Sequence, residues 1–443
     1  MVSRPPDEQS SSPLPGDASS QADTAPQPTL PEPSDAVAET SPPLPEHAAR
    51  PAYHRVLAPD LARGFMLLFI ALANIPWYLH SQQPSTRIFG APPGNVADAI
   101  AQFITVVFID ARSFPMFAFL FGYGMVQFYR SRLARGLADK TVRGMLQRRH
   151  LFLFVFGAVH FLLLFEGDVL APYGVIGLIL VAIFFRRRDK TILIWALIGY
   201  GLLLTLTTVN MVSAILMPDQ TAQLTSQAMV SAAHGRSVTN PDYLATFAAK
   251  PLQFAMSQLG QVFMSPFGTM MMLGWLAARR RYLENAAQHT RLLRRVAIGG
   301  LGVAWVIALP VALTAVGVHQ LSQPLFAWAI LSNILGCLGG LGYIALFALL
   351  AVRWQASPGP AVQAVANVGA RSLSSYLLQS VIFAPLLCAW GFNLGQDLGR
   401  FPAALIAIGT WLIGVAACWW LAQHHHRGPA ETLLRRLTYG AYR

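Results

Sequence analysis

"LFLFVFGAVHFLLLFEGDVLAPYGVIGLILVAIFF", residues 151–185, consists of two apolar runs separated by the short turn Glu166-Gly167-Asp168. As an α-helix, a run of about 20 apolar residues crosses the ~30 Å hydrocarbon core of a bilayer. The pattern predicts a hairpin of two membrane helices, with Gly167 permitting the tight turn. We expect the two carboxylates to face water at the tip of this hairpin.

The composition of the whole chain agrees with such a hairpin. Of its 443 residues, 54% are hydrophobic and only 12% are charged, whereas soluble domains carry about 25% charged residues. We therefore predict an all-α fold, a polytopic transmembrane helical bundle. About ten apolar runs are expected to span the membrane, with cores at 61–79, 112–129, 149–165, 169–185, 191–216, 254–278, 296–317, 325–351, 372–391 and 402–423.

The charges between the apolar runs predict an orientation. Alternate connections along the chain are strongly basic, namely residues 129–149, 186–190, 279–295 and 426–443, and the connections between them hold few cations. Lys and Arg gather in the cytoplasmic loops of membrane proteins. We therefore expect the basic segments, and with them both termini, on the cytoplasmic side.

The sequence favours neither nucleic acid nor a metal ion as a partner. A formal net charge of +12 would suit nucleic acid, but cations beside apolar runs act as topology signals in a membrane protein. We expect the lipid bilayer as a partner and no nucleic acid. Cys337, Cys388 and Cys418 lie far apart within apolar runs, a spacing that predicts neither a metal site nor a disulfide framework.

The chain is expected to have three parts. Residues 1–50 are rich in Pro, Ser, Ala and acids, and such a segment buries too little apolar surface to fold. Residues 51–426 form the predicted transmembrane domain. Residues 427–443 are expected to form a cytoplasmic amphipathic segment, in which Gly428-Pro429 breaks the chain before a short helix that anionic lipid would hold at the membrane surface. The oligomeric state does not follow from the sequence.

One region departs from the pattern of simple spans. Residues 97–130 would form a helix of about 50 Å, and Asp110, Arg112 and Pro115 interrupt it. We expect an interfacial or re-entrant helix over 97–109 on the outer side, followed by a short span from Arg112. Gly122 and Gly124 in that span would let another helix approach closely.

Polar residues in the first apolar run form one group of candidate site residues. Asp60 and Arg63 are three residues apart, close enough to pair on one helix face. Asn74 lies deeper in the run, and His80 lies at its outer end. The group is either an interfacial ion pair with a packing amide, or a cationic mouth in which Arg55 and Arg63 collect an anionic ligand from the cytosol.

A second group surrounds the opening hairpin. His160 lies within an otherwise apolar run, where a histidine is either a packing residue or a general base. Asp168 follows eight residues later, a rise of about 12 Å along a straight helix. Contact between the two requires the chain to fold back at Gly167 or other helices to supply the link.

A third group lies toward the C-terminus. Arg371, Ser375, Gln379 and Ser380 bring polarity to the run that begins near residue 372. The three consecutive histidines at 424–426 point in different directions on a helix, so we do not expect them to bind a metal together.

Five stretches together resemble one protein family. The chain is similar, over roughly residues 55–443, to the YeiB-like membrane proteins, the family of domain of unknown function 418. Ser375 stands where the family pattern has Asn, which puts one polar contact in doubt. The matching stretches are "PDLARGFMLLFIALANI" (59–75), "FPMFAFLFGYGM" (114–125), "FGAVHFLLLFEGDVLAPYGVIG" (156–177), "ARSLSSYLLQSVIF" (370–383) and "RGPAETLLRRLTYG" (427–440).

The resemblance implies a location and a mechanism, because the family is itself similar to the broader membrane acyltransferase superfamily. It implies a bacterial inner membrane, acyl-CoA held from the cytosol, and transfer of the acyl group to a hydroxyl or amine outside. His160 and His80 would be the bases. Asp168, the third catalytic candidate, would line the outer mouth with Glu166, Asp110 and Arg112. The ligand-binding set is Arg55, Asp60, Arg63, Asn74, Arg112, Arg148, Arg149, Arg371 and Gln379. Of these, Arg55, Arg63, Arg148, Arg149 and Arg371 would lie near the donor phosphates.

Fold analogy alone does not establish an enzyme, and two other functions remain open. In a carrier, buried His, Asp and Asn side chains would serve a proton or solute path, although the sequence shows no clear inverted repeat of broken helices. A non-catalytic membrane scaffold would need no such path. A cavity that joined Arg63 to His160 would favour the enzyme, whereas a dry packed interface around His160 would argue against its role as base.

Overall fold

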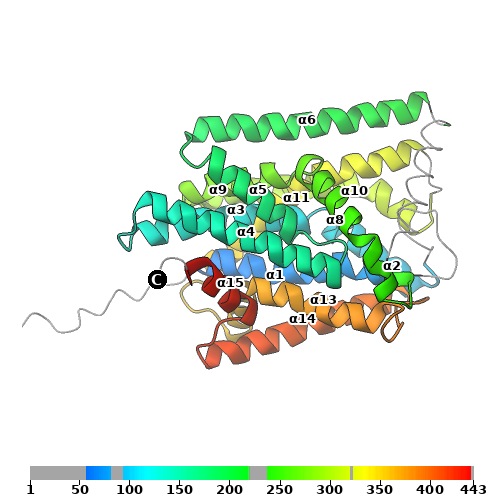
Figure 1. Ribbon diagram of the computed structural model, residues 1–443. Helices are drawn as coiled ribbons and strands as arrows, with labels where there is room; N and C mark the ends of the chain where they lie inside the picture. Colours follow the sequence, from blue (N-terminus) through cyan, green and yellow to red (C-terminus); the bar gives the residue numbers. More distant parts are fainter. Residues whose placement is uncertain (1–55, 81–92, 218, 220–236, 320–322, 441–443) are drawn as a thin grey trace, which may run out of the picture. The chain divides into compact units, whose positions relative to one another are not determined.

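The computed structural model describes residues 56–80, 93–217, 219, 237–319 and 323–440. Within these ranges the chain is helical and contains no strand, apart from an isolated bridge between His80 and Gln396. The expected all-α fold is therefore confirmed for the described residues (Figure 1). The tail of residues 1–50 and Arg55 lie outside them.

The helices coincide with the predicted apolar runs. Six stretches are long and apolar enough to cross a membrane by length and composition, and two shorter apolar helices accompany them. A count of ten spans therefore stays a prediction. The longer elements are α1 (Leu57–Asn74), α3 (Ser113–Leu133), α4 (Asp139–Leu163), α5 (Leu170–Ile183), α6 (Asp189–Leu216), α8 (Lys250–Phe263), α9 (Phe267–Arg279), α10 (Thr290–Ala315), α11 (Gln323–Trp354), α12 (Pro360–Ala370), α13 (Ser372–Leu387), α14 (Arg400–Gln423) and α15 (Pro429–Tyr439).

The run at 254–278 is not one helix, as the sequence had suggested, but two. Helix α8 ends at Phe263 and α9 begins at Phe267. Pro266 lacks a backbone N–H and its ring clashes with the preceding turn, which favours a break at this point. The Ser265 hydroxyl donates to the Gln261 carbonyl and accepts a bond from the Phe267 N–H, which satisfies backbone groups that the break leaves open.

The break expected near Arg112 is present. Helix α2 (Val96–Ile104) continues as a π-helical turn to Ile109, and Ala111 then takes a left-handed conformation with φ of 60°. The guanidinium of Arg112 is 1% exposed and donates to the carbonyls of Val106, Asp110 and Ala304. Arg112 thus satisfies carbonyls that the interrupted helix leaves open.

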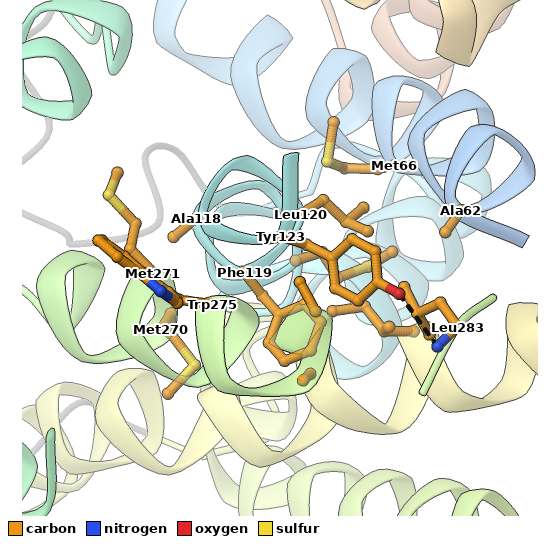
Figure 2. Packing of buried hydrophobic residues seen from close by; sticks show 14 of the residues in the cluster. Ala62, Met66, Ala118, Phe119, Leu120, Tyr123, Met270, Met271, Trp275 and Leu283 are labelled. Atoms are coloured by element: carbon orange, nitrogen blue, oxygen red, sulfur yellow. Dashed lines mark hydrogen bonds between the residues drawn. The ribbon is translucent and has the colours of Figure 1, made fainter. Parts of the chain in front are cut away.

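The packing of α3 against α9 forms the centre of the apolar core (Figure 2). A Cβ on Gly122 would lie 2.0 Å from the Met271 carbonyl oxygen, and a Cβ on Gly274 would lie 1.9 Å from that of Phe119. Glycine on both helices therefore allows backbone contact, as expected for Gly122. Figure 2 shows Tyr123 beside this crossing, with its hydroxyl accepting a hydrogen bond of 3.3 Å from the Leu283 N–H.

The connections between helices fall into two groups at opposite ends of the bundle. The basic segments contact one another, and we call their side the basic end. Its contacts include Arg186–Asp139, Arg279–Asp189, Arg132–Tyr439, Arg148–Leu437 and Arg371–His426. The contacts of the other end include Glu166–Ser237, Leu163–Tyr243, His80–Asp397 and Asp98–Phe401. The segregation of basic and other connections is as predicted, and the membrane side that each end faces stays a prediction.

Candidate functional site

The turn between α4 and α5 is tight because glycines shape it. The amides of Leu164 and Phe165 both donate to the His160 carbonyl, which closes the end of α4. A Cβ on Gly167 would lie 2.5 Å from the Phe165 ring. A Cβ on Gly157 would meet the Ala171 backbone nitrogen at 2.1 Å. The chain therefore folds directly back, and α5 runs in backbone contact with α4.

This reversal brings His160 and Asp168 together. His160 Nδ1 lies 2.7 Å from Asp168 Oδ1, and the two residues are 3% and 0% exposed. His160 and Asp168 would lie about 12 Å apart on one straight helix. Because the chain folds back at Gly167, they come into contact instead. The expectation that Asp168 faces water is wrong, because its carboxylate is enclosed and has a partner.

Four helices hold the Asp168 carboxylate and backbone. Oδ2 accepts a hydrogen bond of 2.9 Å from the Ala171 N–H at the start of α5. The Tyr376 hydroxyl of α13 donates to Oδ1 over 3.4 Å, and the Gln261 amide of α8 donates to the Asp168 carbonyl over 3.2 Å. An ionised carboxylate only accepts hydrogen bonds, so a neutral His160 facing an ionised Asp168 would carry its proton on Nδ1 and a lone pair on Nε2.

The second nitrogen of His160 is the feature that points to chemistry. Nε2 is buried and has no hydrogen-bond partner among the described residues. Aromatic rings surround the imidazole, with the centroids of Tyr376 and Phe165 at 5.3 and 6.1 Å, and Tyr78 stacks on Phe165. Buried polar atoms are rarely left without a partner in proteins. The arrangement can accept a proton from a group that reaches Nε2.

Gln379 and Tyr376 lie one turn apart on α13 and face the same region. Gln379 Nε2 donates to the Leu67 carbonyl of α1 over 2.8 Å, and its Oε1 has no partner among the described residues. Tyr376 was not among the site residues predicted from the sequence. The signal for it was its spacing, because Gln379 and Ser380 follow Tyr376 by three and four residues and share its helix face.

The residues predicted in the first run are not gathered around His160. Asp60 and Arg63 pair as expected, with 3.3 Å between Oδ1 and Nη1, and Arg63 Nη2 donates to the Leu120 carbonyl. Asn74 closes α1, and no hydrogen bond joins it to His160 among the described residues. His80 pairs through its backbone with Gly395 and Asp397 at the end of the bundle opposite the basic end.

Most of the predicted donor arginines contact backbone carbonyls of neighbouring helices. Arg148 Nε donates to the Leu437 carbonyl over 2.6 Å, and Arg371 donates twice to the His426 carbonyl. Arg149 differs, because its guanidinium lies over the Phe128 ring and is repelled by the like charge of Arg63. Arg149 and Arg63 both lie at the basic end.

The polar residues expected at the outer mouth separate into different places. Glu166 is half-buried and accepts a bond of 3.0 Å from the Ser237 N–H. Asp110 and Arg400 line a cavity of about 40 Å³ together with Thr105. Arg112 lies buried against backbone carbonyls. Only Asp168 of this predicted set contacts His160.

Glu431 has a role that the sequence analysis did not assign. Its carboxylate accepts bonds of 2.8 and 3.1 Å from the N–H groups of Leu373 and Ser374, at the start of α13. A carboxylate is stabilised there because it satisfies open amides and faces the positive end of the helix dipole. The order Gly428-Pro429-x-Glu431 is the signal, since the short turn directs the glutamate back to α13. Within the described residues, no group of three His, Cys, Asp or Glu side chains could hold a metal ion.

Comparison with known proteins identifies a matching family model and similar bacterial proteins. The family model described as a protein of unknown function (DUF418) matches residues 277–441. YxaH of Bacillus subtilis (strain 168) is 26% identical over 406 residues, which cover 86% of this chain and 93% of YxaH. YeiB of Escherichia coli (strain K12) is 26% identical over 400 residues, covering 86% of this chain and 96% of YeiB. The chain therefore resembles the DUF418 family model over its C-terminal part, and it is similar to YxaH and YeiB over most of its length.

Proposed function

We propose that this protein is an acyltransferase of a bacterial inner membrane. In this proposal the helices form ten spans, the basic end and both termini face the cytoplasm, and the opposite end faces outward. An acyl group passes from cytosolic acyl-CoA to a hydroxyl or amine acceptor at the outer side. The observation that carries the proposal is the buried His160–Asp168 pair with its open Nε2 atom.

The pair is arranged as a general base and its orienting carboxylate. Asp168 fixes the proton on Nδ1 and the direction of the imidazole, as carboxylates do in hydrolytic triads. Nε2 would take the proton of the acceptor hydroxyl or amine as its oxygen or nitrogen bonds to the thioester carbonyl carbon. The carbon–sulfur bond then breaks, and the coenzyme A thiolate leaves and takes up a proton.

Arginines at the basic end support a donor site on that side. Arg63 and Arg149 repel each other as like charges, so an anion between them would be stabilised, and guanidinium groups suit phosphate. Arg149 and His160 are eleven residues apart on α4, about 16 Å along the helix. The thioester of a donor whose phosphates lie at Arg149 would therefore have to reach inward to meet the acceptor near His160.

One observation favours a proton-coupled carrier as a second candidate function. His160 and Asp168 are almost completely enclosed, and a Tyr376 hydroxyl lies beside the carboxylate. A base that acts on a bulky acceptor needs open access, whereas a proton relay needs only a chain of hydrogen-bonding groups. In an acyltransferase, this enclosure would have to open before an acceptor could reach Nε2 of His160.

Acyl-CoA turnover by the purified full-length protein tests the proposal. We expect His160→Gln to lower turnover by about 100-fold or more, since a general base contributes 10²–10⁴-fold. His424→Gln is the matched control, because His424 is exposed at the end of α14, and it should leave turnover unchanged. If the protein consumes no acyl-CoA with any hydroxyl or amine acceptor, the acyltransferase proposal is wrong. Proton-driven uptake by liposomes that His160→Gln abolishes would support the carrier instead.

A further inference from the structure

A cleft at the basic end lies beside α15. Its volume is about 370 Å³, and Arg427, Thr432, Arg435, Arg436 and Tyr439 line it. All three arginines are exposed. Helix α15 is fixed in place, since Leu434 and Thr438 are buried and the Arg148 side chain donates to the Leu437 carbonyl.

Aromatic rings collect further cations beside the cleft. The guanidinium groups of Arg132 and Arg435 lie 4.9 and 5.3 Å from the centre of the Tyr439 ring, and Arg132 donates to the Tyr439 hydroxyl. Tyr439 stacks with Phe128, and Arg149 lies over the Phe128 ring at 5.8 Å. Arginines from α3, α4 and α15 thus converge on two stacked rings.

Among the described residues these arginines form no ion pair with a carboxylate, and Glu431 acts on Arg149 only from a distance. Glu431 precedes Arg435 by one turn, but its carboxylate is bound to the amides that begin α13. Among the described residues, no carboxylate lies within ion-pair distance of Arg132, Arg149 or Arg435. Like charges at such separations repel one another, so an anion in the cleft would stabilise the arrangement.

We propose that this cleft binds a phosphate group, and that the phosphate belongs to the headgroup of an anionic phospholipid. Guanidinium groups match phosphate in geometry and charge, and basic pockets beside membrane helices bind such headgroups. The apolar surface next to the cleft favours a lipid over a soluble phosphate. Leu151, Val155 and Val159 are 49%, 42% and 50% exposed at four-residue spacing on α4. They form a stripe that begins one turn after Arg148, along which acyl chains can lie.

The test titrates the full-length protein in detergent micelles with phosphatidylglycerol, phosphatidylcholine and glycerol phosphate. Bound molecules are counted by native mass spectrometry. The variant is Arg435→Gln with Arg436→Gln, and the matched control is Arg294→Gln with Arg295→Gln, an exposed pair in the first turns of α10. Both variants lose two cations from the basic end. Thermal unfolding without added lipid shows that each is folded.

We expect the unmodified protein to bind phosphatidylglycerol at least tenfold more tightly than phosphatidylcholine. The Arg435/Arg436 variant should lose roughly tenfold or more of that affinity, at about 1 kcal/mol for each cation near an anionic surface, and the α10 control should keep it. Equal binding by both variants overturns the site. Glycerol phosphate that binds as tightly as phosphatidylglycerol overturns the lipid assignment and leaves a site for a soluble phosphate compound.

Discussion

At the scale of single residues, the hydrogen bond between His160 and Asp168 should couple the two side chains energetically. Removing one partner leaves a polar group buried without compensation, which costs more than removing both. We expect His160→Gln and Asp168→Asn each to lower thermal stability, with the double variant less affected than the sum. A coupling of about 1–3 kcal/mol, measured by unfolding of the four proteins in micelles, is the expected result.

Additive effects of the two substitutions would contradict this coupling. Additivity is the behaviour of distant sites without shared partners, so it would mean that the two side chains do not interact. Stability is a useful readout here because it does not depend on knowing the reaction. It tests the geometry on which both candidate functions rest.

A second prediction at this scale concerns Gly122, at the close crossing of α3 and α9. Gly122→Ala would place a Cβ 2.0 Å from the Met271 carbonyl oxygen, so α3 and α9 would have to separate. Overpacking of this kind costs about 1–3 kcal/mol. Gly302→Ala on α10 is the control, because nothing lies within 4 Å of its Cβ, and alanine there should be neutral or slightly stabilising. Equal unfolding midpoints for the two variants would refute the close crossing.

At the scale of elements, Asp139 joins two turns at the basic end. Its carboxylate accepts hydrogen bonds from Tyr129, Arg143 and Arg186, at 2.8, 3.1 and 3.1 Å. The Tyr129 hydrogen bond, and then the Arg186 guanidinium, lower the pKa of Asp139 below its usual value. A lowered pKa in the folded protein means that Asp139 stabilises the fold above the ordinary carboxyl pKa. This stabilisation is lost as the pH falls through the lowered value.

The pH dependence of Asp139→Asn checks this contact. The variant should be less stable than the unmodified protein at pH 7, and the difference should shrink steadily below about pH 4, the ordinary carboxyl pKa. Unfolding midpoints of both proteins between pH 3 and 8 give the comparison. A difference that stays constant over this range would show that the charge of Asp139 contributes nothing to holding the turns together.

The elements themselves were mostly predictable from the sequence, and the reasons are local. Apolar runs and the basic segments between them mark helices and their alternation, and Asp110 with Arg112 marked the break before α3. The second break was missed because apolar residues recur on both sides of Pro266. Proline at that position was the available signal.

At the scale of the whole molecule, the two groups of connections predict a topology that can be measured directly. We expect an alkaline phosphatase reporter fused after Asn240 to be active outside the membrane. The same reporter fused after Lys190 should be inactive, because residues 186–190 belong to the basic end. The opposite result would invert the proposed orientation and move the donor site to the outer side.

The contacts within the candidate site could not be predicted from sequence periodicity. His160 and Asp168 were both recognised as unusual, but their contact depends on how closely Gly157 lets α5 approach α4. Arg112, Arg148 and Arg371 are charged residues beside apolar runs, and nothing in their spacing reveals that each binds a backbone carbonyl of a distant segment. Contacts between elements far apart in sequence depend on packing, which a single sequence does not encode in any periodic pattern.

The broken run formed by α8 and α9 has a mechanical consequence. Eight residues of α9 are buried against the core, whereas in α8 only Lys250 is buried. Helix α8 contacts the hairpin through Lys250, which donates to the Leu162 carbonyl, and through Gln261, which donates to the carbonyl of Asp168. Any movement of α8 about the break at Pro266 would have to part these two hydrogen bonds and the packing of Phe254 against Phe154 and Phe161 of α4. The helix beside the enclosed pair is therefore fastened to the hairpin itself far more than to the core that holds α9.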